Sequence, residues 1–314
     1  MGNVMRICKW PVIAILVIVL GTVPLWGSEY VLLFFMLFLL YLALSQMWNL
    51  LAGYSGLISL GQQSFVGLGG YTVAILCNYY QVPLWISILV GGLFSCIIAL
   101  FMSLFIFRMK GVYFAIGTWI FAETLLIWFG NWRYVKYGAG HFIKPPRSPS
   151  MEEIYYMAFV AGIGSVILVY TLLRSRLGLG LMAMRDDDPV AETMGVKVFR
   201  SKLYCFIIGA FVTGVAAGIL YTFQVFIKPV DAFAINWTVK LVFIVIIGGI
   251  GTVEGPILGS LIFVFLSQSL AEYLSVGMLI LGVIAIIVIL VAPKGIMGSL
   301  QERLGFEILS PRRK

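Results

Sequence analysis

The sequence has little charge for its length. Only 11% of its 314 residues are Asp, Glu, Lys or Arg, whereas soluble domains carry about 25%. Such a chain cannot cover its surface with charge, and its 61% hydrophobic content indicates that it faces lipid. The net charge of +8 would suggest nucleic acid only on a soluble fold with a basic face. We therefore expect no nucleic-acid partner.

Patterns for catalysis and metal binding are also missing. His141 is the only histidine, which excludes the H-E-x-x-H metal motif and argues against a Ser-His-Asp triad. The four cysteines form no C-x-x-C pair, which argues against disulfides and zinc. No G-x-x-x-x-G-K-[ST] motif occurs, so the chain does not hydrolyse nucleotides through a P-loop. We expect no catalytic residue, metal or cofactor in this chain.

What the sequence does contain is long apolar runs. Every backbone N–H and C=O in hydrocarbon needs a partner inside the protein. Runs such as VLLFFMLFLLYLAL (31–44) do not alternate as the strands of a membrane β-barrel would. The sequence therefore predicts an all-α, polytopic transmembrane bundle of about 8–10 spans, forming one domain over residues 1–314. The apolar segments are approximately 11–27, 30–51, 57–79, 84–107, 111–130, 154–173, 203–224, 237–250, 256–271 and 274–292.

Lys and Arg orient these spans, because basic residues resist translocation. With both termini in the cytoplasm, most Lys and Arg residues fall on the cytoplasmic side, including those in the loop 174–202. The loop 131–153 is then outside, although it is basic. A signal peptide is the alternative for the first segment, since Arg6 and Lys9 precede it, but no small-x-small cleavage site follows.

Glycine interrupts two of the apolar stretches, GYSGLISLGQQSFVGLGG (53–70) and GGIGTVEGP (248–256). Irregular backbone at membrane depth is tolerated only where it is buried in protein or lines a wet cavity, and transporters place such breaks at their substrate route. Ser59, Gln62 and Gln63 add polar groups to the first stretch. We therefore predict that it lines a translocation pathway.

Single glycines in these stretches also suit close helix packing through small residues. Gly67 with Gly70, or Gly255 with Gly259, could serve that purpose alone. For any one glycine the sequence leaves both interpretations open.

Two further polar residues inside apolar runs are pathway candidates. Glu123 lies mid-segment in AIGTWIFAETLLIWF, and ionisable residues within spans are rare and expensive. It would either face a central cavity or form a buried carboxyl bonded to another helix. Asn49 is the second candidate, with a helix–helix hydrogen bond as its alternative role.

The loop 174–202 carries a local helix signal. Asp188 is suited to an N-cap, Pro189 to the first helical position and Gly195 to the position after the helix. The sequence therefore predicts a short helix over 189–194. Its apolar side chains Val190 and Met194 would gain nothing from exposure to water, which favours docking into a groove on a cytosolic partner. A solvated connector is the alternative.

The run LGLGLMAMRDDDPVAETMGV (177–196) resembles the cytoplasmic motif of LivM-type permeases, which are membrane subunits of branched-chain amino acid ABC importers. Three other stretches agree, and together the resemblance covers most of residues 40–300. They are NLLAGYSGLISLGQQSFVGLGGYTVAIL (49–76), GVYFAIGTWIFAE (111–123) and LVFIVIIGGIGTVEGPILGSLI (241–262).

The resemblance implies a permease fold, a bacterial or archaeal plasma membrane and a set of partners. These are a LivH-type second permease, two cytosolic ATPases that bind ATP and Mg, and an extracytoplasmic binding protein that delivers substrate. It also implies that the loop 174–202 is a coupling loop that contacts the ATPase. The matching residues are Arg185, Asp186, Asp187, Asp188, Glu192 and Gly195.

The outer loop departs from the family pattern. Many members carry a Thr-Gly-Gly run there, whereas this sequence has KYGAGHFIKPP (136–146). That difference puts the substrate in doubt, because the family includes relatives assigned to urea and amides. A self-sufficient secondary transporter or channel is a further alternative, and a membrane enzyme is disfavoured by the lack of acid–base groups.

Overall fold

The computed structural model describes residues 2–270, 274–292 and 294–304, and helices dominate this part of the chain. The membrane-length and other long helices are α1 (Gly2–Trp26), α2 (Glu29–Asn49), α3 (Gln62–Tyr80), α4 (Leu84–Ile106), α5 (Val112–Asn131), α6 (Met151–Leu173), α9 (Val198–Gln224), α11 (Asn236–Gly248), α12 (Gly255–Ser269) and α13 (Leu274–Val291). The shorter elements are η1 (Leu50–Tyr54), η2 (Arg133–Gly138), β1 (His141–Phe142), α7 (Arg176–Asp186), α8 (Asp188–Thr193), β2 (Phe226–Ile227), α10 (Pro229–Ala232) and α14 (Gly295–Leu304).

The prediction of an all-α bundle is confirmed, and each of the ten predicted apolar segments overlaps one of the long helices. In the described part of the chain, six helices are long and apolar enough to cross a membrane. They are Glu29–Tyr54, Leu84–Ile106, Val112–Asn131, Met151–Leu173, Val198–Gln224 and Pro229–Gly248. Ile13–Trp26 and Gly255–Ser269 are shorter apolar helices. The total of 8–10 spans stays a prediction.

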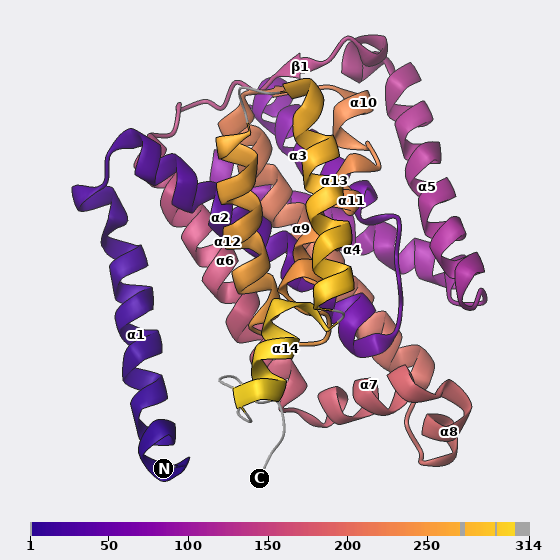
Figure 1. Ribbon diagram of the computed structural model, residues 1–314. Coiled ribbons are helices and arrows are strands. Elements are labelled where there is room, and N and C mark those ends of the chain that lie inside the picture. Colours follow the sequence, from indigo (N-terminus) through magenta and orange to yellow (C-terminus); the bar gives the residue numbers. More distant parts are fainter. Residues whose placement is uncertain (1, 271–273, 293, 305–314) are drawn as a thin grey trace.

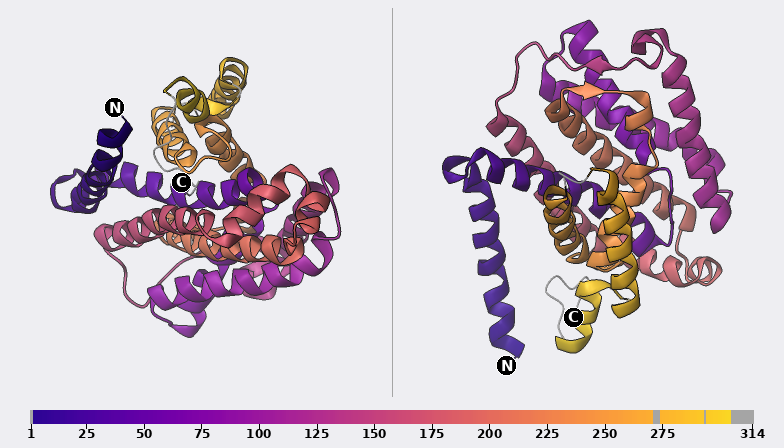
Figure 2. Two further views of the ribbon diagram at one scale, coloured as in Figure 1. Left: turned by 90° about the horizontal axis from the view of Figure 1, so that it is seen from below. Right: turned by 45° about the horizontal axis from the view of Figure 1, so that its top comes forward.

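Helices α2, α3 and α9 form the centre of the bundle. α9 packs along α3, α4 and α2, and α2 also contacts α6, α11 and α12. Figure 1 shows α1 at one edge of the bundle and α5 at the opposite edge. The view from below in Figure 2 also shows α1 at the edge of the bundle, where it contacts α2 and α6. α7 and α8 project from one end, and β1 lies at the other end (Figure 1).

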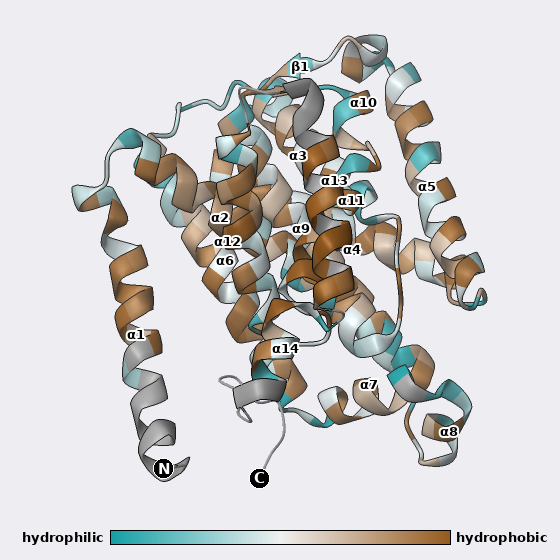
Figure 3. Ribbon diagram, viewed as in Figure 1, coloured by the Kyte–Doolittle hydropathy of each residue, from teal (hydrophilic) through white to brown (hydrophobic). Residues whose placement is uncertain are grey.

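The outer surface of the bundle is apolar. On α4, Leu93, Ile97 and Phe101 are 56%, 62% and 53% exposed. A contiguous apolar surface of this kind is unfavourable in water and suits contact with lipid. Figure 3 shows hydrophobic residues along the length of the long helices, whereas hydrophilic residues gather at the loops and around α7 and α8.

Glycines allow the helices to approach closely inside the bundle. A Cβ on Gly259 would lie 1.9 Å from the Ile244 carbonyl oxygen, and one on Gly69 would lie 2.2 Å from the Gly214 carbonyl oxygen. Gly67 likewise leaves room for the ring of Phe233. Backbone-to-backbone contact therefore holds α11 against α12 and α3 against α9, as the packing interpretation of these glycines requires.

A small clasp closes the outer end of the bundle. β1 pairs antiparallel with β2, with His141 opposite Ile227 and Phe142 opposite Phe226. The Asn78 side chain at the end of α3 donates to the Phe142 carbonyl at 2.8 Å and accepts from the Lys144 N–H at 2.8 Å. The end of α3, the loop after η2 and the segment after α9 are thereby joined.

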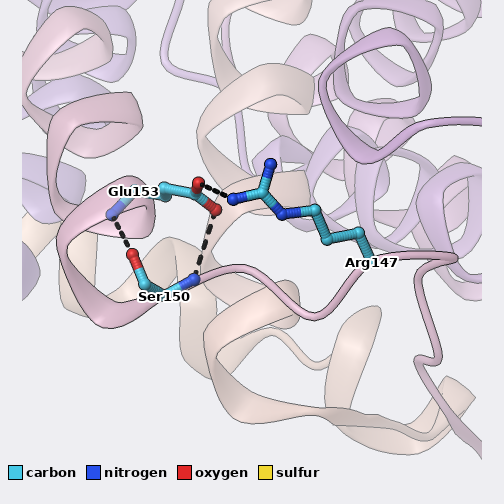
Figure 4. A network of polar contacts seen from close by, with 3 residues as sticks. All are labelled: Arg147, Ser150 and Glu153. Carbon is cyan, nitrogen blue, oxygen red and sulfur yellow. Dashed lines mark hydrogen bonds and ion pairs between the residues drawn. The ribbon is translucent and has the colours of Figure 1, made fainter.

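The start of α6 is fixed by a capping box (Figure 4). The Glu153 N–H donates to Ser150 Oγ at 3.2 Å, and the Ser150 N–H donates back to Glu153 Oε2 at 3.2 Å. Arg147 adds an ion pair to Glu153 at 2.8 Å. Two N-terminal backbone donors are satisfied in this way, which defines where the outer loop ends and the helix begins.

Candidate functional site

The first glycine-rich stretch interrupts the path from α2 to α3. α2 continues into the π-helical turn η1, residues 56–61 are not helical, and α3 begins at Gln62. π-helical turns are rare and often lie at functional sites. Gly56 has a φ of +70°, which glycine adopts without strain. The predicted segment 57–79 was therefore wrong at its start, because residues 57–61 belong to the irregular break.

The second break, at residues 249–254 between α11 and α12, lies against the first. The Asn49 side chain donates to the Thr252 carbonyl at 2.8 Å and accepts from the Gly251 N–H at 2.9 Å. A Cβ on Gly53 would lie 2.7 Å from the Gly251 nitrogen. We name this contact of Asn49, Gly53, Gly251 and Thr252 the glycine junction. Asn49 thus bonds backbone on another segment, as its alternative role proposed.

A neighbouring residue strengthens the junction. Gln46, one turn before Asn49 on α2, donates from Nε2 to the Val253 carbonyl at 2.8 Å. Both side chains are fully buried. Since carbonyl and N–H groups of a non-helical segment need partners when buried, these two α2 amides replace the hydrogen bonds that the break gives up.

Ser59, Gln62 and Gln63 are buried together at the start of α3. Gln62 Nε2 donates to Thr213 Oγ1 of α9 at 2.8 Å, and the Thr238 hydroxyl of α11 donates to the Gln63 carbonyl. The hydroxyl of Ser59 accepts from the Gly61 N–H at 3.2 Å. The structure therefore brings these three predicted residues into one polar region where α3, α9 and α11 meet.

Glu123 lies away from that region. It is half-buried on α5, and the Trp119 indole N–H of the same helix donates to its Oε1 at 3.0 Å. The interpretation as a buried carboxyl bonded to another helix was wrong on this point, because the bond comes from the preceding turn of α5. Thr118 is the α5 residue that reaches the break, because its hydroxyl accepts from the Leu60 N–H at 3.0 Å.

The helix predicted in the loop 174–202 is α8, with a shifted start. Asp187 is its N-cap, and its side chain accepts from the Val190 N–H at 3.2 Å. The prediction of Asp188 as the N-cap and of a helix over 189–194 was therefore wrong by one residue. Asp188 is inside the helix and pairs with Lys202 of α9. Three successive aspartates left more than one candidate for the N-cap in the sequence. The ion pair with Lys202 engages Asp188, and Asp187 is the N-cap.

Gly195 follows the C-cap residue Met194, which is the position after the helix that the sequence predicted for it. Gly195 has a φ of +83°, and its N–H donates to the Glu192 carbonyl at 2.9 Å while the Val196 N–H donates to the Ala191 carbonyl at 3.1 Å. This pattern is a Schellman motif. Glu192 is exposed. The side chain of Asp186 lies outside the described part of the structure.

A cavity of about 560 Å³ separates α8 from the first break. Its wall includes Ser55, Ile58, Arg185 and Phe199. Within the described residues, no group of three or more His, Cys, Asp or Glu side chains could hold a metal ion. The site therefore consists of the two breaks, after η1 and after α11, with the projecting helix α8 on the other side of the cavity.

Comparison with known proteins places this arrangement in a family. Residues 29–292 match the family described as the permease component of the branched-chain amino acid transport system. The chain belongs to this family. The permease is accordingly a multi-pass membrane protein of the transport-subunit type.

Individual relatives agree. The permease is 25% identical over 296 residues to the high-affinity branched-chain amino acid transport system permease protein LivM of Salmonella typhimurium, covering 85% of this chain and 69% of that protein. LivM of Escherichia coli matches with the same figures. LivH of Escherichia coli is 29% identical over 147 residues, covering 46% of each chain. No solved structure matches the permease.

Proposed function

We propose that the permease forms, with a LivH-type second permease, the translocation pathway of an ABC importer for a branched-chain or other hydrophobic amino acid. Two cytosolic ATPases would bind ATP and Mg and drive it, and an extracytoplasmic binding protein would deliver the solute. The relatives support this proposal, since their names describe high-affinity branched-chain amino acid transport. Likeness to both LivM and LivH suits two related subunits that share one pathway.

The observation that carries the proposal is the exposed apolar side of α8. Val190 and Met194 are 48% and 72% exposed on a capped helix that projects from one end of the bundle (Figure 1). An amphipathic helix of this kind gains free energy when a groove on a partner covers its apolar face. We place this end in the cytosol. The start of α1 and the helix α14 lie at the same end, which suits cytoplasmic termini (Figure 1).

The start of α3 supports a pathway at the break. Within the described residues, Gln62 Oε1, Gln63 Nε2 and Ser64 Oγ are buried and have no hydrogen-bond partner. The N-terminal end of a helix carries partial positive charge, and transporters aim such half-helix ends at anionic substrate groups. The pathway would therefore pass Ser59, Gln62 and Gln63, with Asn49 holding the break in place and Glu123 further along α5.

The first test is assembly with the ATPases. We expect the unmodified permease to copurify with both ATPases and its second permease, and Val190→Asp to lose the ATPases. Val230→Asp is the matched control, because Val230 is 66% exposed on α10 near the opposite end. If both variants keep the ATPases, α8 is not part of the interface with them.

The second test is coupling and substrate. Deletion of 186–195 should leave membrane insertion intact and abolish substrate-stimulated ATP hydrolysis; full stimulation in the deletion would overturn the proposal. Uptake into vesicles by this chain alone under an ion gradient would favour a secondary transporter. Identification of the ligand of the cognate binding protein would decide between an amino acid and urea or a short amide.

A further inference from the structure

Arg185 of the loop 174–202 is exposed and lines the cavity, and the end of its side chain lies beside the membrane breaks. A Cβ on Gly251 would lie 2.7 Å from Arg185 Nη1 and 3.1 Å from the Gly53 carbonyl oxygen, so the guanidinium lies beside the glycine junction. A Cβ on Gly56 would lie 3.5 Å from the Arg185 Cα. Helix α7, which ends one residue after Arg185, also contacts η1. The last turn of α7 is thus packed on the first break.

The charge of Arg185 suits this place. The continuous helix α2–η1 ends at Tyr54, and α11 ends at Gly248, so two helix C-termini lie within three residues of the junction. Helix C-termini carry partial negative charge and favour a nearby cation. The ion pairs recorded among the described residues are Arg147 with Glu153 and Lys202 with Asp188, and neither uses Arg185.

Other residues of the same loop point elsewhere. Asp187 caps α8, Asp188 pairs with Lys202, and Val190 and Met194 are exposed on α8. Since α8 follows α7 directly, a displacement of α8 would be carried by the end of α7 to the position of Arg185. The glycine junction there fastens both breaks, so both would receive the same displacement.

We propose that Arg185, although exposed, is a positioning residue that links the coupling helix α8 to the glycine junction, and that its guanidinium acts on this junction and not on the ATPase. The inference rests on the proposed function. It separates the residues of α8, which would meet the ATPase, from Arg185, which would meet the glycine junction. The link transmits the state of the ATPase to the ends of α2–η1 and α11 together.

The experiment uses the full complex with the second permease and both ATPases in lipid nanodiscs. The four native cysteines are replaced, and a single cysteine is introduced by Ile58→Cys. Ile58 is 55% exposed in the wall of the cavity. The rate at which maleimide labels the new cysteine reports on the conformation of the break. The rate is measured without nucleotide and after trapping with ATP and vanadate, so no transported solute is needed. Arg185→Ala and Arg185→Lys are compared with the control Arg176→Ala, which changes another exposed arginine of α7.

We expect trapping to change the labelling rate about fivefold or more in the parent and in Arg176→Ala, as allosteric coupling commonly does. Arg185→Ala should keep both ATPases and basal ATP hydrolysis but lose this response, and Arg185→Lys should retain part of it because the cation remains. Loss of the ATPases from Arg185→Ala, or an unchanged response, would overturn the inference. Absence of ATPases from the parent complex would instead overturn the proposed function.

Discussion

Asn49→Ala would measure how firmly the two broken helices are joined. The change removes the acceptor of the Gly251 N–H and the donor to the Thr252 carbonyl, whose bonds are 2.9 Å and 2.8 Å long. A buried polar group left without its partner costs about 1–3 kcal/mol, so the two together would cost about 2–6 kcal/mol. Side-chain hydrogen bonds in a bilayer average only about 0.6 kcal/mol, because the unfolded chain also finds partners there. We therefore expect the lower end, about 2–3 kcal/mol.

The assay is the free energy of unfolding of the purified permease in lipid bicelles. Asn131→Ala is the matched control: the Asn131 amide donates to the Ile127 carbonyl of its own helix on an exposed surface. Its change should stay within about 0.5 kcal/mol. If the two variants unfold with equal free energies, the side chain of Asn49 does not hold the breaks together, and the account of the glycine junction is refuted.

Three further predictions concern glycine contacts and the carboxylate of α5. Gly259→Ala should destabilise the permease by about 3 kcal/mol in the same assay, because its methyl would collide with the α11 backbone. The control is Gly164→Ala, whose new methyl would have no atom within 4 Å and which should stabilise the permease by about 1 kcal/mol. Gly195→Ala strains the end of α8 by about 1–2 kcal/mol, and a binding titration should show weaker ATPase affinity than in the parent. Glu123→Gln keeps an acceptor for the indole N–H and should lower uptake of radiolabelled leucine; unchanged uptake at normal expression would assign Glu123 a structural role.

The helices could be predicted from the sequence because their cause is local. A run such as 31–44 has no backbone partner in lipid other than itself, so its length and composition suffice to predict α2. The two breaks were also predictable, since clustered glycines weaken a helix wherever they occur. Gly195 could be predicted as the end of α8 for the same reason: its left-handed conformation is a property of one residue.

The parts that could not be predicted join residues far apart in the sequence. Asn49 and Gly251 are separated by 202 positions, and nothing in either stretch identifies the other as its partner. The pairing of β1 with β2 involves two residues on each side, too few for a strand pattern. Asp187 displaced Asp188 as the N-cap because Lys202, on the next helix, pairs with Asp188. The place of the Arg185 guanidinium beside Gly251 likewise follows from tertiary packing.

The outer clasp has a mechanical consequence for any opening of the bundle. α3 is joined to the clasp at its outer end through Asn78 and contacts α9 closely at Gly69, so we expect the two helices to tilt together. The distance from Asn78 to Gln62 along the helix, 16 residues at 1.5 Å each, is roughly 24 Å. A tilt of about 10° about Asn78 would therefore move Gln62 sideways by roughly 4 Å, a distance comparable to the width of a small side chain.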